Sequence, residues 1–184
     1  DRTYKRINTF FDSDIVCHIS MSEPTSESLM ETCVNALKEI GLNFIHKGTY
    51  VAIEGPQFST HAESKGYKLC GADIIGMTNM PEAKLAREAE IRYATIGMVT
   101  DYDCYKVEYL DVDINQIIST LKNNIELAKK IIDILITTFD KNINKNDPIQ
   151  TCLNSAIVTD ISTASKETIS NLNTIMRRYK YENK

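Results

Sequence analysis

The stretch TYVAIEGPQFSTHAESKGYKLC, residues 49–70, decides the fold of this chain. Residues 49–53 are rich in β-forming side chains and are followed by the turn Gly55-Pro56, which predicts a strand. Thr60 and Glu63 then have the spacing of a capping box, so they predict a helix that begins here and runs toward Cys70. The stretch therefore predicts strand, loop and helix in succession.

The same alternation extends in both directions. Before the stretch, residues 27–40 have apolar positions at helical spacing and predict a helix. Ser28 and Glu31 are its expected capping box, and Gly41 is its expected carboxy-terminal cap. Residues 42–45 then predict a short strand. After it, the pattern predicts a strand over 73–77, a helix from Pro81 and a buried strand over 93–99. Alternation of this kind indicates an α/β fold.

The carboxy-terminal part is predicted to be helical. Asp113 and Gln116 have the spacing to cap a long amphipathic helix, which a polar linker over 140–148 follows, and a final amphipathic helix is expected near the end. The apolar positions of the two helices are Ile114, Ile117, Ile118, Leu121, Ile125, Ala128, Ile131, Ile132 and Leu135, and then Ile169, Leu172, Ile175, Met176 and Tyr179. We expect one α/β domain over residues 1–184, with a helical carboxy-terminal extension over 140–184.

Composition excludes several classes of function. The chain has 184 residues, of which 42% are hydrophobic. Its 21 basic and 25 acidic residues give a net charge of −4, so we do not expect it to bind nucleic acid. Five widely spaced cysteines without a C-x-x-C pair argue against a disulfide framework and a zinc site, and favour a cytoplasmic protein without metal. No apolar run approaches membrane-spanning length. Because the chain begins on a polar segment without Met, we expect it to continue a longer polypeptide.

Three loops follow the predicted strands, and in α/β sheets ligands bind beyond the carboxyl ends of strands. The loops cover residues 54–60, 77–79 and 100–103. The carboxyl groups of Asp101 and Asp103 have the chemistry to accept from an exocyclic amine or to protonate a ring nitrogen. The alternative is that Asp101 only caps a turn and Asp103 is solvated.

Four segments of the sequence resemble the methylthioadenosine phosphorylases, the trimeric type of the purine nucleoside phosphorylase family. They are CHISMSEP (17–24), IEGPQFSTHAES (53–64), GADIIGMTNMPEAKLAREA (71–89) and TDYDC (100–104). The resemblance runs from about residue 1 to about residue 128 and fades after the long helix. It implies a mixed central β-sheet flanked by helices, with the amino-terminal part of the sheet missing from this chain.

The resemblance also implies roles for individual residues. Asp101 is implied to meet the purine N7 and to supply its proton, Asp103 to face the 6-amino group, and Thr78 to contact phosphate. His18 is implied to reach into the site of a neighbouring subunit, and hence a homotrimer is expected. The remaining substrate contacts implied by the resemblance are Phe58, Ser59, Met77, Ile117 and Ile118, of which the two isoleucines are equally explained by core packing.

The implied reaction is phosphorolysis of 5′-methylthioadenosine to adenine and 5-methylthioribose 1-phosphate, a step of methionine and purine salvage. It needs no metal or organic cofactor, because phosphate is a co-substrate and the charges that develop at both ends of the breaking bond can be stabilised by the protein. A 6-aminopurine offers a donor at N6 and an acceptor at N7, which suits two acidic residues. A phosphorylase for 6-oxopurine nucleosides is the alternative enzyme, and relatives of that kind have Asn where Asp101 stands.

The phosphate site is incomplete in the sequence. Only Thr78 is a plausible contact, and Gln57 and His61 occupy positions where relatives commonly have Arg. The family has a glycine-containing phosphate loop in roughly its first third, and we expect such a segment to precede these residues. If it does not, the alternative is a non-catalytic remnant that acts as a binding or structural protein.

Overall fold

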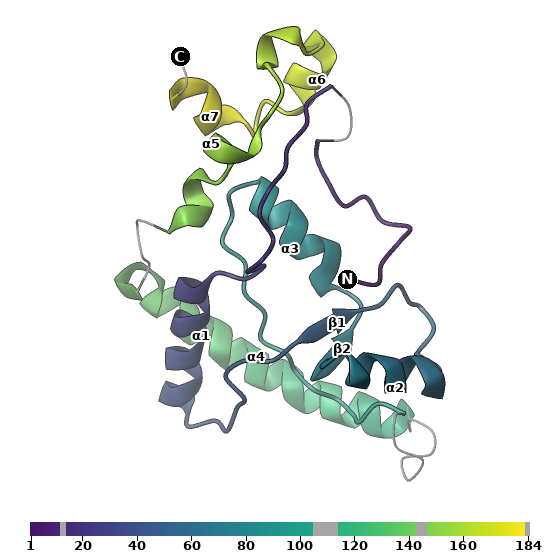
Figure 1. Cartoon of the computed structure of the whole chain (residues 1–184). Coiled ribbons are helices and arrows are strands. Elements are labelled where there is room, and N and C mark those ends of the chain that lie inside the picture. The colour runs from purple at the N-terminus through teal and green to yellow at the C-terminus, as the bar shows by residue number, and fades with distance from the viewer. Residues whose placement is uncertain (12–13, 105–113, 143–146, 183–184) are drawn as a thin grey trace.

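The computed structural model describes residues 1–11, 14–104, 114–142 and 147–182. Helices dominate, and one pair of short strands lies near the middle of the chain (Figure 1). In chain order the elements are α1 (Glu27–Ile40), β1 (Tyr50–Ala52), α2 (His61–Leu69), β2 (Ile74–Gly76), α3 (Asn79–Glu88), α4 (Ile114–Asn142), the 3₁₀ turn Pro148–Thr151, α5 (Leu153–Ala156), the 3₁₀ turn Ile161–Thr163, α6 (Lys166–Asn171) and α7 (Arg177–Glu182).

The two strands pair in parallel, as expected for a strand–helix–strand unit. Tyr50 lies opposite Ile74 and Ala52 opposite Gly76, so both strands end at the same edge. A Cβ atom at Gly76 would lie 1.9 Å from the hydroxyl oxygen of Tyr50, so a larger residue there would require the Tyr50 side chain to move. The predicted strands over 49–53 and 73–77 are confirmed, each with shorter bounds.

Local signals place the helices that follow the two strands. The Thr60 hydroxyl accepts from the Glu63 N–H at 3.3 Å and the Glu63 carboxylate accepts from the Thr60 N–H at 2.8 Å, which confirms the predicted capping box of α2. In α3, Met80 has a non-helical backbone with φ −121° and ψ 135°, and regular helix begins at Pro81, as predicted.

Helix α1 has the predicted bounds but a different first cap. Ser26, and not Ser28, is the N-cap residue, because its side-chain oxygen accepts from the Leu29 N–H at 3.3 Å. The Ser28 hydroxyl donates instead to the carboxylate of Asp147, 2.8 Å away. Gly41 ends the helix in the left-handed region with φ 75°, as predicted.

Two predicted strands are wrong. Residues 42–45 form no strand, and residues 93–99 are β-forming in composition but pair with no strand among the described residues. The Tyr93 carbonyl accepts from the Ser26 N–H at 2.8 Å and the Val99 carbonyl accepts from the Asn124 side chain at 3.2 Å. A strand needs a neighbour to complete its hydrogen bonds, and here two of the carbonyls bond instead to Ser26, the N-cap residue of α1, and to Asn124 in α4.

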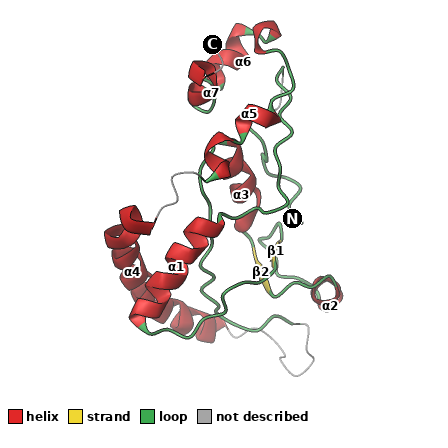
Figure 2. Ribbon diagram, turned by 60° about the vertical axis from the view of Figure 1, so that its left-hand side comes forward, coloured by secondary structure: helices red, strands yellow, loops and turns green. Residues whose placement is uncertain are grey.

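The carboxy-terminal segment forms its own core with the amino-terminal part of the chain. Figure 2 shows α5, α6 and α7 gathered on the far side of α3 from α4. The buried residues of this core are Phe11, Ile15, Leu153, Leu172 and Met176. The single final helix predicted from the apolar spacing is wrong: α6 ends at Asn171 and α7 begins at Arg177, although the apolar positions are buried or packed on the core as predicted.

Helix α4 packs on α1 and passes below the strand pair in the view of Figure 1. The expected cap Asp113 lies outside the described residues, and so do residues 143–146 of the expected polar linker. In the described part of the chain, no helix combines the length and the apolar character needed to cross a membrane.

Candidate functional site

The loops that follow β1 and β2 leave the sheet side by side. The pairing continues one residue past the strands, since the Ile53 N–H donates to the Gly76 carbonyl at 2.9 Å. Residues 53–60 and 77–80 therefore begin at one edge, because the two parallel strands that they follow end there.

The third loop contacts the β1–α2 loop and the start of α2, although no strand precedes it. The Cys104 thiol donates to the Ser59 carbonyl at 3.3 Å, a ring nitrogen of His61 pairs with the Cys104 carbonyl, and the Ser64 hydroxyl donates to the Asp103 carboxylate. Burial raises the pKa of the Cys104 thiol, and the charge of Asp103 raises it further, so the thiol is protonated and serves as a donor at neutral pH. Residues 100–104 are thus attached to the β1–α2 loop.

Ser59 supplies the polar atom that best marks this region as a binding site. Among the described residues, its hydroxyl oxygen is buried and has no hydrogen-bond partner. A buried hydroxyl without a partner costs free energy, so natural proteins rarely retain one unless a ligand or water completes it. Beside it, Phe58 is 69% exposed, which leaves an aromatic face available to a ligand.

The loop after β2 contributes an apolar and a polar side chain. The sulfur of Met77 faces Gly55, where a Cβ atom would lie only 2.5 Å from it, and Gly55 itself has φ 68°. A side chain at Gly55 would therefore be strained and would push Met77 away. Thr78 is exposed at the start of α3, and its side chain makes no capping bond.

The two carboxyl groups of the third loop have different environments. Asp101 is exposed, and its carboxylate accepts from the Thr100 hydroxyl at 2.6 Å. Asp103 is half-buried and bonded to Ser64. A third acid, Glu54, is turned toward the amino-terminal segment: its carboxylate accepts from the N–H groups of Tyr4 and Lys5, and the bond from Tyr4 is the largest cause that lowers its pKa.

Three predicted site residues lie outside the three loops. Ile117 is half-buried and Ile118 is 46% exposed on α4, the helix whose Asn124 binds the Val99 carbonyl. His18 is exposed and lies beside the carboxy-terminal segment, where its N–H donates to the Ala156 carbonyl at 2.8 Å. The role of His18 in a neighbouring subunit stays a prediction.

Some contacts that shape the site do not follow from local spacing in the sequence. Ser64, Cys104 and Arg6 each bind a loop of the site through a contact that spans 39 or more positions of the chain. Ser64 and Cys104 lie inside the motifs singled out above, but their contacts do not follow from local spacing. Arg6 could be found only by its position in the folded chain.

Comparison with known proteins identifies relatives over most of the chain. The model of the "Phosphorylase superfamily" matches residues 3–137. A protein of Geobacter sulfurreducens named S-methyl-5′-thioadenosine phosphorylase is 42% identical over 97% of this chain and 62% of its own length. One of Cereibacter sphaeroides with the same name is 49% identical over 72% of this chain and 46% of its own. The chain thus spans about three-fifths of the relatives that it matches over nearly all of its length.

The similar solved structures belong to proteins of the same kind as the sequence relatives. A methylthioadenosine phosphorylase from an Antarctic soil metagenomic library has a TM-score of 0.86 and 39% identity, covering 95% of this chain and 61% of the solved chain. A variant of the adenosine/methylthioadenosine phosphorylase of Schistosoma mansoni in complex with adenine has a TM-score of 0.79 and 28% identity, covering 86% of this chain and 64% of its own. The first of these likenesses extends past residue 137, where the family model ends.

Proposed function

Because this chain belongs to the phosphorylase superfamily, we propose that it supplies the base- and ribose-binding loops of an enzyme that cleaves 5′-methylthioadenosine with phosphate. The products are adenine and 5-methylthioribose 1-phosphate. The chain spans 62% of the length of the first relatives that it matches, and those relatives are named for this activity. The observation that carries the proposal is the buried hydroxyl of Ser59, which has no hydrogen-bond partner among the described residues and lies where residues 100–104 attach to the β1–α2 loop.

The acidic residues of the third loop select the base. Asp103 is held by Ser64 and faces the 6-amino group as an acceptor, while Asp101 meets N7 and provides the proton that the leaving adenine needs. A 6-oxopurine would present an acceptor to a carboxylate, which is repulsive. The 6-oxopurine nucleoside phosphorylase is therefore the weaker candidate.

The other side chains of the loops suit the rest of the substrate. Phe58 offers its exposed ring to the purine and ribose, Met77 lies under the ribose, and Ile117 and Ile118 form the apolar wall for the methylthio group. Thr78 contributes one hydroxyl to phosphate. A single hydroxyl binds a dianion weakly, so the phosphate site needs further donors from outside the described residues.

Catalysis then requires neither a metal ion nor an organic cofactor, since phosphate is the nucleophile and the protein stabilises charge at both ends of the bond.

We further propose a cytoplasmic homotrimer, in which His18 of one subunit completes the site of the next. The net charge of −4 and the cysteines, which are unpaired in the structure, suit this compartment.

The first prediction is that adenine release by the natural polypeptide depends on phosphate. Incubation with 5′-methylthioadenosine should give adenine and 5-methylthioribose 1-phosphate in equal amounts with phosphate present, and neither without it. Chromatography of both products is the measurement. Adenine formed at the same rate without phosphate would indicate a hydrolase, and tight nucleoside binding with no turnover would indicate the non-catalytic alternative.

The second prediction concerns Ser59→Ala. Because its hydroxyl has no hydrogen-bond partner in the part of the chain that the structure describes, the variant should melt at the same temperature or higher. Loss of one hydrogen bond to the base should raise KM for the nucleoside by roughly tenfold. Thermal unfolding and steady-state kinetics measure the two effects. A lower Tm with unchanged KM would mean that the hydroxyl is a structural group.

A further inference from the structure

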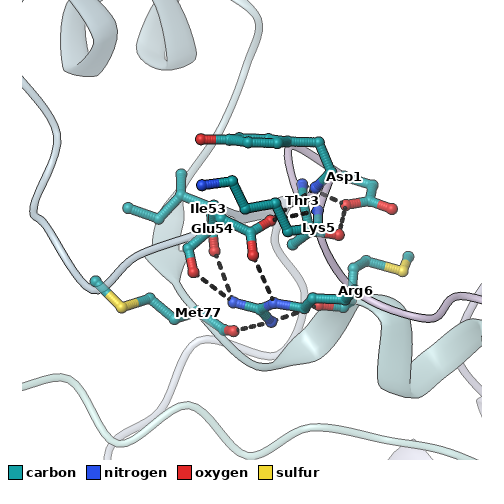
Figure 3. Close-up of polar contacts among 9 residues, drawn as sticks. Asp1, Thr3, Lys5, Arg6, Ile53, Glu54 and Met77 are labelled. Atoms are coloured by element: carbon teal, nitrogen blue, oxygen red, sulfur yellow. Dashed lines mark hydrogen bonds and ion pairs between the residues drawn. The ribbon is translucent and has the colours of Figure 1, made fainter.

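A single guanidinium group connects the two loops at the edge of the strand pair. One terminal nitrogen of Arg6 donates to the carbonyl oxygens of Glu54 and Ile53, at 2.6 and 3.3 Å, directly after β1. The other donates to the carbonyl oxygens of Met77 and, at 3.0 Å, Met80, directly after β2. Figure 3 shows Arg6 lying between the two loops, with its side chain directed at the carbonyls of Ile53, Glu54 and Met77.

The guanidinium is itself held in place. Its Nε lies 3.4 Å from a carboxylate oxygen of Glu54, and the other oxygen of that carboxylate accepts from the N–H groups of Tyr4 and Lys5 at 2.7 and 3.3 Å. The amino-terminal segment is therefore wrapped around Glu54, and the side chains of Arg6 and Glu54 are 27% and 16% exposed. Such a partly buried, multiply bonded arginine has little freedom to move.

We infer that Arg6 is a positioning residue for the proposed phosphorolysis, an inference that rests on that proposed function. It fixes the loop that carries Phe58 and Ser59 relative to the loop that carries Met77 and Thr78. The purine, the ribose and the phosphate are contacted from different loops, so the distance between the loops sets whether one substrate can meet all of these groups at once. The contacts of Arg6 are with main-chain oxygens of both loops and with the Glu54 carboxylate, so it acts through the loops that it holds.

Holding both loops in this way requires arginine. Its planar guanidinium presents five N–H donors in fixed directions. One terminal nitrogen binds the two carbonyls after β1, the other binds those of Met77 and Met80, and Nε faces the Glu54 carboxylate. A lysine ammonium has three donors at one point and cannot reach both loops in the same way. Without the fork, each loop settles independently, and small misplacements of binding groups lower reaction rates strongly.

The test compares Arg6→Lys and Arg6→Met with Arg178→Met in the natural polypeptide. Arg178 is a matched control, because it also binds a glutamate, Glu90, with its side chain 26% exposed, but it lies in the carboxy-terminal segment away from the loops. We expect kcat/KM of Arg6→Met to fall by roughly 10- to 100-fold, mainly through a higher KM for methylthioadenosine. Arg6→Lys should recover part of this loss, and Arg178→Met should lower Tm with KM unchanged.

A purely structural role of Arg6 would reduce the folded fraction, which lowers the apparent kcat and leaves KM unchanged. An unchanged KM in Arg6→Met, or in Arg6→Lys if the first variant does not fold, therefore overturns the inference. If the unmodified protein has no phosphorylase activity, the proposed function fails. Exchange of the backbone amide hydrogens then still tests whether Arg6 positions the two loops. Faster exchange confined to residues 53–59 and 77–80 in Arg6→Lys, and not in Arg178→Met, supports it; equal exchange rejects it.

Discussion

Replacing Asp101 with Asn is expected to lower the turnover of 5′-methylthioadenosine by ~10²–10⁴-fold, the usual contribution of a general acid. The carboxyl group is exposed on the third loop, where it accepts from the Thr100 hydroxyl at 2.6 Å and is open to a ligand. Asparagine keeps the size of the side chain but has no transferable proton. Because an amide can donate toward a 6-oxo group, the ratio of inosine-type to adenosine-type cleavage should rise in the same variant.

The control for Asp101 is Thr100→Val, which removes the bond within the turn and leaves the carboxyl in place. If Asp101 only caps the turn, both variants should lose stability to a similar extent and keep their preference for the adenine nucleoside. Measurements of kcat/KM for both nucleosides together with Tm separate the two roles. Near-normal turnover with unchanged base preference in Asp101→Asn would remove the proton-donor assignment.

Features that depend on neighbouring residues could be predicted from the sequence. Thr60 and Glu63 form the predicted capping box, and Gly41 ends α1 in the left-handed region. The parallel pairing of the two strands follows from the helix between them, because a connection of that length returns the chain in the same direction. Since both strands then end at one edge, the meeting of the first two loops was also predictable.

Features that depend on distant partners could not be predicted. The sequence over 93–99 resembles a buried strand, but its described backbone bonds go to Ser26 and Asn124, which are far along the chain. The bonds of Arg6 span 47 to 74 positions, and no spacing rule reports them. The roles assigned to Asp101, Thr78 and His18 stay predictions, because the family resemblance supplies them and the contacts of the free chain do not test them.

Asp147 is an acidic residue outside the site whose loss should have the largest effect on stability. Its carboxylate is 7% exposed and accepts from the hydroxyls of Ser26 and Ser28, each at 2.8 Å, from the Arg92 Nε at 3.1 Å and from the Ile149 N–H at 3.0 Å. It thereby joins the start of α1 to the segment before the third loop and to the carboxy-terminal part. Burial acts to raise the pKa of Asp147, but the bonds from Ile149 and the two serines and the charge of Arg92 together lower it.

We expect Asp147→Ala to lower the free energy of unfolding by about 3–5 kcal/mol, because it breaks the ion pair between Arg92 and Asp147, whose side chains are only 11% and 7% exposed. For a chain of this size that corresponds to a Tm lower by roughly 6–20 °C. Glu27→Ala is the matched control: the Lys47–Glu27 pair is exposed, at 57% and 58%, so its loss should cost at most about 1 kcal/mol.

Since the pKa of Asp147 is lower in the folded than in the unfolded protein, its contribution to stability is complete near neutral pH and is lost as the pH falls through the folded value. Denaturant unfolding at neutral and acidic pH measures both effects, and the difference between Asp147→Ala and the unmodified protein should shrink in acid. Equal stability of the Asp147→Ala and Glu27→Ala variants at neutral pH would mean that the buried pair does not hold these three parts of the chain together.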